Sequence, residues 1–284
     1  HARHGHPATS VMVATHGKEL TVGHNFKKIS LATIKEASKK GCAICNAAFG
    51  HGIIKGKTSD ARPSDLPLAM LDSFGPVKVK SIFHNYIYAN TATLTLSGIL
   101  YADGSTNIKN EVLVEFANNF RALVRPYVGE IAALRTDSIK QTTTDKRWKS
   151  YANGPDPFVA EHSIPHKHWE LSPIERVHKD AWPMVLSMLL TARRGLKWWW
   201  VCYRQSILLL NIRATRKEGG TANDITSRWK EFYGVAYNES NLRVMLSPCQ
   251  YYVDKSQRDK PDARMRNGLW CGISPENVNA AWIW

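Results

Sequence analysis

Two cysteines at metal-ligand spacing are the first residues whose types point to chemistry. Cys42 and Cys45 form a Cys-Ala-Ile-Cys pair, and His51 follows shortly after them. Thiolates and imidazoles bind zinc, but a structural zinc site needs four ligands, and the sequence contains no second pair at this spacing. We therefore expect the two cysteines to pack as small apolar residues in a helix. Metal binding by Cys42, Cys45 and His51 is the alternative.

A second group of chemistry-bearing residues lies in the stretch EHSIPHKHWE. His162, His166 and His168 stand close together there, and Pro165 interrupts the helical spacing that a metal-binding pair of histidines would need. We expect a polar loop at this position. A nucleophilic pair of cysteine and histidine stays open as an alternative, because such partners are often distant in the sequence.

The charge balance narrows the classes of partner. The 284 residues include 38 Lys and Arg against 24 Asp and Glu, a net charge of +14. Such a surface attracts nucleic acid, anionic lipid or acidic proteins. Five scattered cysteines do not form the dense framework of a small secreted protein, so we expect a cytoplasmic location.

The stretch RGLKWWWVCYRQSILLLNI, residues 194–212, contains three tryptophans in a row that lead into an apolar run. Charged residues interrupt it, among them Lys197 and Arg204, so it does not read as a membrane span. We expect a buried strand in which Trp198 and Trp200 face one side of a sheet and Trp199 faces the other. Part of this aromatic area could also serve protein contact, because tryptophan is enriched in interfaces.

Other patterns predict the elements of the N-terminal half. We expect a loosely held arm over 1–30, a helix over 31–50 and a loop over 51–75. Alternating residues between 77 and 116 predict strands, with a tight hairpin at Ala102-Asp-Gly-Ser105. Residues 31–150 then form an N-terminal α+β region.

A breaker, SYANGPDPF at 150–158, marks the start of a second region over 151–284. We expect a helix there that ends at Gly195 and is divided at Pro183. A further helix follows from about residue 224, and NLRVMLS predicts a short strand. Helices alternating with strands indicate an α/β fold with a central, mostly parallel sheet and flanking helices.

Several of these segments resemble, in order, the fungal heterokaryon-incompatibility (HET) domain family. The stretch SLATIKEASKKGCAICNAAF is similar to the region upstream of that domain, and FVAEHSIPH to one of its strands. LLTARRGLKWWWV resembles the family's helix, glycine and aromatic strand, and RWKEFYGVAYNESNLRVMLS resembles the helix and strand that follow. The residues that match by type are Trp200, Trp229, Glu231 and Tyr237.

The resemblance implies a TIR-like fold and a role in fungal non-self recognition and programmed cell death. It implies protein partners such as NLR-like receptors, or self-association, in the cytoplasm. Glu231 is then the candidate catalytic acid. The candidate binding residues are Trp198, Trp199, Trp200, Trp229 and Tyr237. The resemblance assigns no cofactor.

Two other classes of function stay open. One is a basic nucleic-acid-binding or structural protein, such as a coat or ribonucleoprotein component, which the net charge favours. The other is an enzyme, either a TIR-like nucleotide hydrolase that depends on Glu231 or one that uses Cys45 with His51.

Overall fold

A computed structural model describes residues 11–12, 14–15, 21–22, 67–136, 146–154, 157–162, 172–216, 224–257, 263–274 and 280–284. The predicted arm and the helix expected over 31–50 lie outside these residues, apart from three short pieces. Within the described residues, no helix is both long and apolar enough to cross a membrane.

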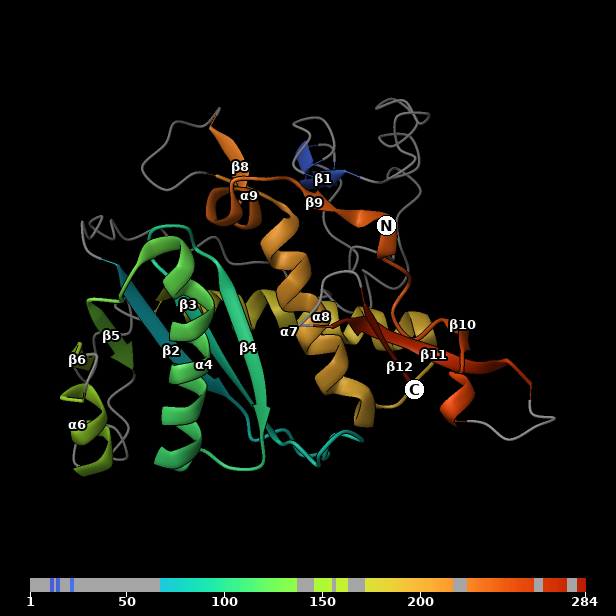
Figure 1. The fold of residues 1–284 in the computed structure, drawn as a ribbon, viewed down its shortest axis with the longest axis horizontal. Helices are drawn as coiled ribbons and strands as arrows, with labels where there is room; N and C mark the ends of the chain where they lie inside the picture. Colours follow the sequence, from blue (N-terminus) through green and yellow to red (C-terminus); the bar gives the residue numbers. More distant parts are fainter. Residues whose placement is uncertain are drawn as a thin grey trace.

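The structure contains helices around a central sheet and several small sheets (Figure 1). The helices are α4 (Asn110–Val128), α6 (Lys146–Ala152), α7 (Ser172–Ala192), α8 (Trp199–Ile212) and α9 (Arg228–Tyr233), with 3-10 turns η4 (Leu196–Trp198), η5 (Glu239–Asn241) and η6 (Lys255–Gln257). The central sheet contains β2 (Leu68–Phe74), β3 (Tyr88–Leu94), β4 (Leu100–Ser105), β5 (Ala133–Thr136) and β6 (Val159–His162). The other strands are β1 (Thr21–Val22), β7 (Ala214–Arg216), β8 (Ile225–Ser227), β9 (Tyr237–Asn238), β10 (Pro248–Tyr252), β11 (Met265–Ile273) and β12 (Ala281–Ile283).

The central sheet has the strand order β4-β3-β2-β5-β6 and is mixed. β2, β3 and β4 form an antiparallel meander, whereas β5 and β6 run parallel to β2. α4 connects β4 to β5 and supplies the long crossover that a parallel connection requires. β5 and β6 pair with each other although the expected division at residues 150/151 falls between them.

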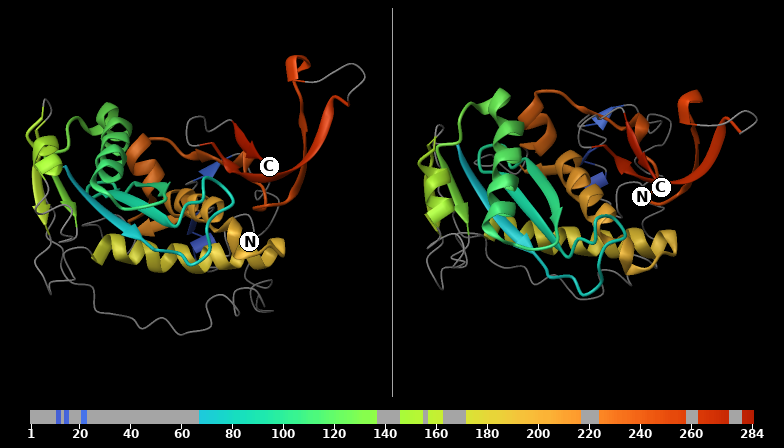
Figure 2. Two further views of the ribbon diagram at one scale, coloured as in Figure 1. Left: turned by 90° about the horizontal axis from the view of Figure 1, so that it is seen from below. Right: turned by 60° about the horizontal axis from the view of Figure 1, so that its bottom comes forward.

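The two faces of this sheet pack against different helices. On one face, Leu71 of β2 and Ala92 of β3 cluster with Phe116 and Phe120 of α4. Successive residues of a strand point to opposite sides, so Leu68 and its even-numbered neighbours on β2 point the other way, toward α7 and α8. Figure 2 shows α7 running along this second face. Asp72 therefore belongs to the face that α7 and α8 cover.

α8 is buried on every side, which accounts for its lack of a polar face. It lies between α7, the edge strand β4 and the C-terminal strand β11. The side chain of Asn211 on α8 forms two hydrogen bonds with the backbone of Leu100, as a neighbouring strand would. Its amide oxygen accepts the N–H of Leu100 at 2.9 Å, and its amide nitrogen donates to the carbonyl of Leu100 at 2.8 Å. This pair of bonds closes the edge of β4, which would otherwise hold two unpaired backbone groups.

The small C-terminal sheet has the order β10-β11-β12 and joins the same core. Trp270 and Cys271 of β11 are buried with α8. The outer ends of β10 and β11 extend away from the rest of the protein (Figure 2).

Three predictions in the first half of the chain are wrong. The loop expected up to residue 75 includes β2, and the hairpin expected at 102–105 is the end of β4. The last of the strands expected between 77 and 116 is instead the first part of α4, because Leu113, Phe116, Phe120 and Val124 repeat at helical spacing and are all buried. The chain turns between β3 and β4 at residues 95–99 instead.

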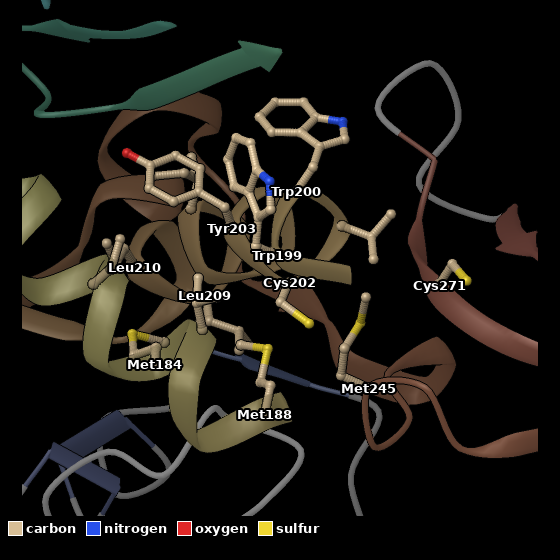
Figure 3. Packing of buried hydrophobic residues seen from close by; sticks show 14 of the residues in the cluster. Met184, Met188, Trp199, Trp200, Cys202, Tyr203, Leu209, Leu210, Met245 and Cys271 are labelled. Atoms are coloured by element: carbon tan, nitrogen blue, oxygen red, sulfur yellow. The ribbon is translucent and has the colours of Figure 1, made fainter. Parts of the chain in front are cut away.

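The strand predicted for LKWWWV is also wrong, because the three tryptophans form η4 and the start of α8. A segment that is apolar on all sides has no periodicity, so sequence alone cannot distinguish a buried strand from a buried helix. Trp199 and Tyr203, four residues apart, lie on one face of this helix. Figure 3 shows Trp199, Trp200 and Tyr203 directed toward the central sheet.

In the rest of the second half, the helix predicted before Gly195 is confirmed as α7 and continues through Pro183 without a break. The helix predicted from about residue 224 is shorter, because 225–227 form β8 and α9 ends before Gly234, which is left-handed with φ 72°. The strand predicted for NLRVMLS is wrong: residues 242–247 are irregular and β10 begins afterwards.

Candidate functional site

Of the four residues matched by the HET resemblance, Trp229, Glu231 and Tyr237 lie on α9 or shortly after it, whereas Trp200 lies on α8. Glu231 is exposed, and its Oε1 accepts a hydrogen bond from Thr226 Oγ1 at 2.8 Å. Trp229 lies between two tyrosines, with ring centroids 4.2 Å from Tyr233 and 4.8 Å from Tyr237. The structure thus brings Trp229 and Tyr237 together, and Glu231 projects from the same short helix into solvent.

The tryptophans of the WWW stretch are core residues. The side chains of Trp198, Trp199 and Trp200 are 4%, 0% and 2% exposed, which leaves no surface for a partner. Trp199 Nε1 donates to the carbonyl of Val79 at 3.0 Å, and Trp200 stacks on Tyr203. Their role in this structure is packing between α8, the 75–87 loop and the sheet.

The proposed metal ligands Cys42, Cys45 and His51 lie outside the described residues. Of the three histidines in EHSIPHKHWE, only His162 belongs to a described element, as the last residue of β6. Within the described part of the chain, no group of three or more His, Cys, Asp or Glu residues stands close enough to hold a metal.

The structure assembles a different polar group on the α7 face of the sheet. Asp72 lies near the end of β2, and its Oδ2 is 3.3 Å from Nε2 of His178 on α7. This is an ion-pair distance without the alignment of a hydrogen bond, since His178 Nε2 has no hydrogen-bond partner. The other carboxylate oxygen, Oδ1, accepts the backbone N–H of Ser73 at 2.8 Å.

The second ring nitrogen of His178, Nδ1, takes part in a hydrogen bond. It shares this bond with the Tyr203 hydroxyl at 2.7 Å, and that hydroxyl shares another with Thr91 Oγ1 at 3.0 Å. Thr91 is the cross-strand partner of Asp72 in the register of β2 and β3. The chain of contacts from Asp72 through His178 and Tyr203 to Thr91 therefore returns to the strand position beside Asp72.

The polar chain is enclosed by apolar surface. Phe74 stacks on His178 with ring centroids 5.6 Å apart and on Tyr203 with centroids 5.9 Å apart. Burial raises the pKa of Tyr203, the hydrogen bond from Thr91 opposes this, and the charge of Asp72 raises the pKa further. Tyr203 therefore keeps its proton at neutral pH and has one hydrogen to donate, to His178 or to Thr91.

A second carboxylate lies one helical turn before His178. Glu175 is partly exposed, with Lys179 Nζ 3.8 Å from its Oε2. Residues three apart on a helix lie on the same side, and Ile174, next to Glu175, is fully buried with Leu68 and Met70 of β2. The start of α7 thus carries Glu175 along β2, on the same side of the helix as the residue that contacts Asp72.

No protein-family model matches the sequence, and no curated protein matches it. Solved structures do match by fold. A chain from the cryoEM structure of a simian T-cell lymphotropic virus intasome in complex with PP2A regulatory subunit B56 gamma is 11% identical, with a TM-score of 0.51 over 97% of this chain and 94% of that one. At this identity the likeness concerns the fold alone, which is an integrase-like arrangement of the ribonuclease H type.

Two integrase catalytic core domains also match, over shorter stretches. The core of BIV integrase is 14% identical with a TM-score of 0.40, over 59% of this chain and 93% of that chain. The HTLV-2 integrase core in complex with magnesium is 12% identical with a TM-score of 0.44, over 60% of this chain and 99% of that chain.

Sequence reasoning missed Asp72, because residues up to 75 were expected to be loop. A signal was present: a single acidic residue stands within the apolar run LAMLDSF. A charge in a buried strand needs a partner or a function. His178 and Tyr203 carry no such signal, since only the packing of α7 against α8 brings them together.

Proposed function

We propose that this chain is an integrase-type enzyme that acts on phosphodiester bonds of nucleic acid, with a divalent cation bound by carboxylates at the end of β2. The observation that carries the proposal is the position of Asp72, a partly exposed carboxylate near the end of the central strand of an integrase-like sheet. In open α/β folds, functional groups gather beyond the carboxyl ends of parallel strands.

The donor set fits a hard divalent cation. Asp72 and Glu175 offer carboxylate oxygens, and their side chains are 21% and 37% exposed, so solvent reaches both residues. Mg²⁺ is typically held by one or two carboxylates together with substrate phosphate oxygens and water. A bound ion would neutralise charge on the phosphate and lower the pKa of bound water. With two carboxylates and no thiolate, this set favours Mg²⁺ or Mn²⁺ over zinc.

The protein's own contribution is to orient the carboxylate. Ser73 N–H holds one oxygen of Asp72, and His178 stands against the other. The orientation of the His178 ring is restricted in turn, because its Nδ1 shares a hydrogen bond with the Tyr203 hydroxyl at 2.7 Å. That hydroxyl is itself bonded to Thr91. Groups behind a metal ligand restrict its rotamer and raise the affinity of the site.

The charge of the chain supports nucleic acid as the substrate. A net charge of +14 attracts a phosphate backbone, and the carboxylates at β2 would repel it without a cation. Asp137 follows Thr136 of β5 in the sequence and lies outside the described residues. Because β5 is the parallel neighbour of β2, Asp137 is a further residue to test.

The experiment is a nicking assay on supercoiled plasmid with Mg²⁺ or Mn²⁺, using EDTA as the blank. We expect cleavage by the wild type that needs the cation, and loss of cleavage in Asp72→Asn and Glu175→Gln. Glu161→Gln is the matched control, since Glu161 is a carboxylate of the same sheet that pairs with Arg135. Equal activity in Asp72→Asn and wild type would overturn the proposal.

The incompatibility-type signalling function stays a separate proposal, supported by the HET resemblance. Toxicity on expression in a fungus would support it. A deletion that includes α8 is an unsuitable variant for this test, because it removes the centre of the core. Glu231→Gln is the better variant, since Glu231 is exposed and its change leaves the core intact.

A further inference from the structure

The loop that follows β2 carries cations on an ordered backbone. Lys78 and Lys80 are exposed, while Val77 before them and Ser81 after them are buried. The loop begins at Gly75, whose φ of 132° suits only glycine and where a Cβ would lie 2.6 Å from the carbonyl oxygen of Ile87. The two lysines thus project outward from a segment with a defined conformation.

Backbone and side-chain bonds fix this loop to the turn between α7 and α8. The N–H of Ile82 donates to the carbonyl of Lys197 at 2.8 Å, and Trp199 Nε1 donates to the carbonyl of Val79, which lies between the two lysines, at 3.0 Å. Lys197 comes three residues after the exposed pair Arg193 and Arg194. The bonds bring the two basic segments side by side.

The positive charge of these segments is not neutralised within the described part of the chain. No ion pair there includes any of the five cations of the two segments. They are Lys78, Lys80, Arg193, Arg194 and Lys197. By contrast, the exposed cations Arg125 and Lys179 do face carboxylates. Five unneutralised cations on a fixed scaffold favour an anionic partner that extends over several charges.

The loop that carries Lys78 and Lys80 begins at the end of β2, the strand that carries Asp72. Phe74, the last residue of β2, stacks on His178, and the loop leaves β2 directly after it. α7 then runs from His178 to its end before Arg193, a rise of about 22 Å at ~1.5 Å per residue. Figure 2 shows the loop and α7 extending in the same direction. About six base pairs of duplex, at ~3.4 Å each, span that length.

We propose that Lys78 and Lys80, with Arg193, Arg194 and Lys197, form a track that binds the phosphate backbone of duplex DNA beside the Asp72 carboxylate. The track rests on the proposed function, because it takes nucleic acid as the substrate. Its contacts are to phosphate and carry no base specificity. The lysines would position the duplex so that a bound strand reaches the end of β2.

The test is binding of a 30-base-pair duplex in EDTA, measured as log Kd against log salt concentration. The variants are Lys78→Gln/Lys80→Gln and, as a control with the same loss of charge on other faces, Lys149→Gln/Lys230→Gln. Both control lysines are exposed. We expect the track variant to lower the salt slope by about 0.9 for each lysine and to weaken binding by about tenfold or more at ~0.1 M salt. The control should keep the wild-type slope.

The other outcomes overturn the track in distinguishable ways. If both variants bind as the wild type does, with the same slope of log Kd against log salt, the track is contradicted and the proposed function still stands. Failure of the wild type to bind duplex DNA would overturn both proposals. Melting curves of the variants should match the wild type, since the changed side chains are exposed, and Arg193→Gln/Arg194→Gln repeats the test at the other end of the surface.

Discussion

His178 on α7 stands 3.3 Å from Asp72 on β2, and its opposite ring nitrogen shares a hydrogen bond with Tyr203 on α8. One imidazole thus links the central strand to both helices that cover this face of the sheet. The link joins two helices to the sheet, and we propose that it also orients the partly exposed carboxylate of Asp72. Separate measurements test the two roles.

The Tyr203 hydroxyl couples Thr91 and His178, so Tyr203→Phe should lower the free energy of unfolding by about 1–3 kcal/mol. The reason is that both partners lose a hydrogen bond inside the core. Thr91→Val should also destabilise the fold, and the double variant should lose less than the sum of the two single losses. Denaturant unfolding of the four proteins measures this, and strictly additive losses would show that the hydroxyls act independently.

Asn211→Leu should lower the free energy of unfolding by about 1–3 kcal/mol for each backbone group of Leu100 that loses its partner. Leucine keeps the approximate size of the side chain but offers neither the acceptor nor the donor that closes the edge of β4. Asn119→Leu on the exposed side of α4 is the matched control and should change stability by about 0.5 kcal/mol or less. Equal effects at the two sites would contradict the strand-like role of Asn211.

Trp199→Ala should destabilise the fold by about 3–5 kcal/mol, because it leaves a large cavity in the core. The midpoint of urea unfolding reports the change. Val235→Ala, at a position that is 61% exposed, should shift stability by about 0.5 kcal/mol or less. A Trp199→Ala protein of wild-type stability would point to a binding surface instead of a core position.

Asp103 on β4 predicts a dependence of stability on pH. Burial raises its pKa, Glu115 raises it further, and the N–H of Gly104 with Arg204 and His84 opposes the rise. A carboxyl whose pKa is higher in the folded state destabilises the fold once it ionises. The free energy of unfolding should therefore fall as the pH rises from about 3.9, the usual pKa of Asp, through the raised value.

Asp103→Asn removes this ionisation while the side-chain oxygen can still accept the N–H of Gly104. Unfolding measured at a series of pH values should show the variant gaining stability relative to wild type as the pH rises to 7. Parallel curves for the two proteins would contradict the assigned direction of the shift.

The spacing of apolar residues predicted some helices correctly and suggested strands where others lie. α7 was predictable because its apolar residues repeat at helical spacing up to the glycine that follows. α4 was missed because its first residues, Asn110 to Phe116, alternate in polarity as a strand does before the helical repeat becomes clear. α8 was missed because burial on every side removes any period from the sequence.

The candidate site depends on contacts that no local pattern records. Asp72 and His178 are far apart in the sequence, and they meet because Ile174 and Val177 bury the inner side of α7 against the core. Thr91 joins them through the antiparallel register of β2 and β3. Of the residues matched by the HET resemblance, Trp229 and Tyr237 form an aromatic cluster with Tyr233, whereas Trp200 packs against Tyr203 in the core around α8.

The most direct test of the account is the binding of Mn²⁺ to the purified protein, followed by calorimetry or by electron paramagnetic resonance. Asp72→Asn should weaken the affinity for Mn²⁺ the most. His178→Ala should weaken it by about 10–100-fold, as expected when a group that orients a ligand is removed. Glu161→Gln should bind as the wild type does. An unchanged Mn²⁺ affinity in folded Asp72→Asn protein would contradict the assignment of this carboxylate as a metal ligand.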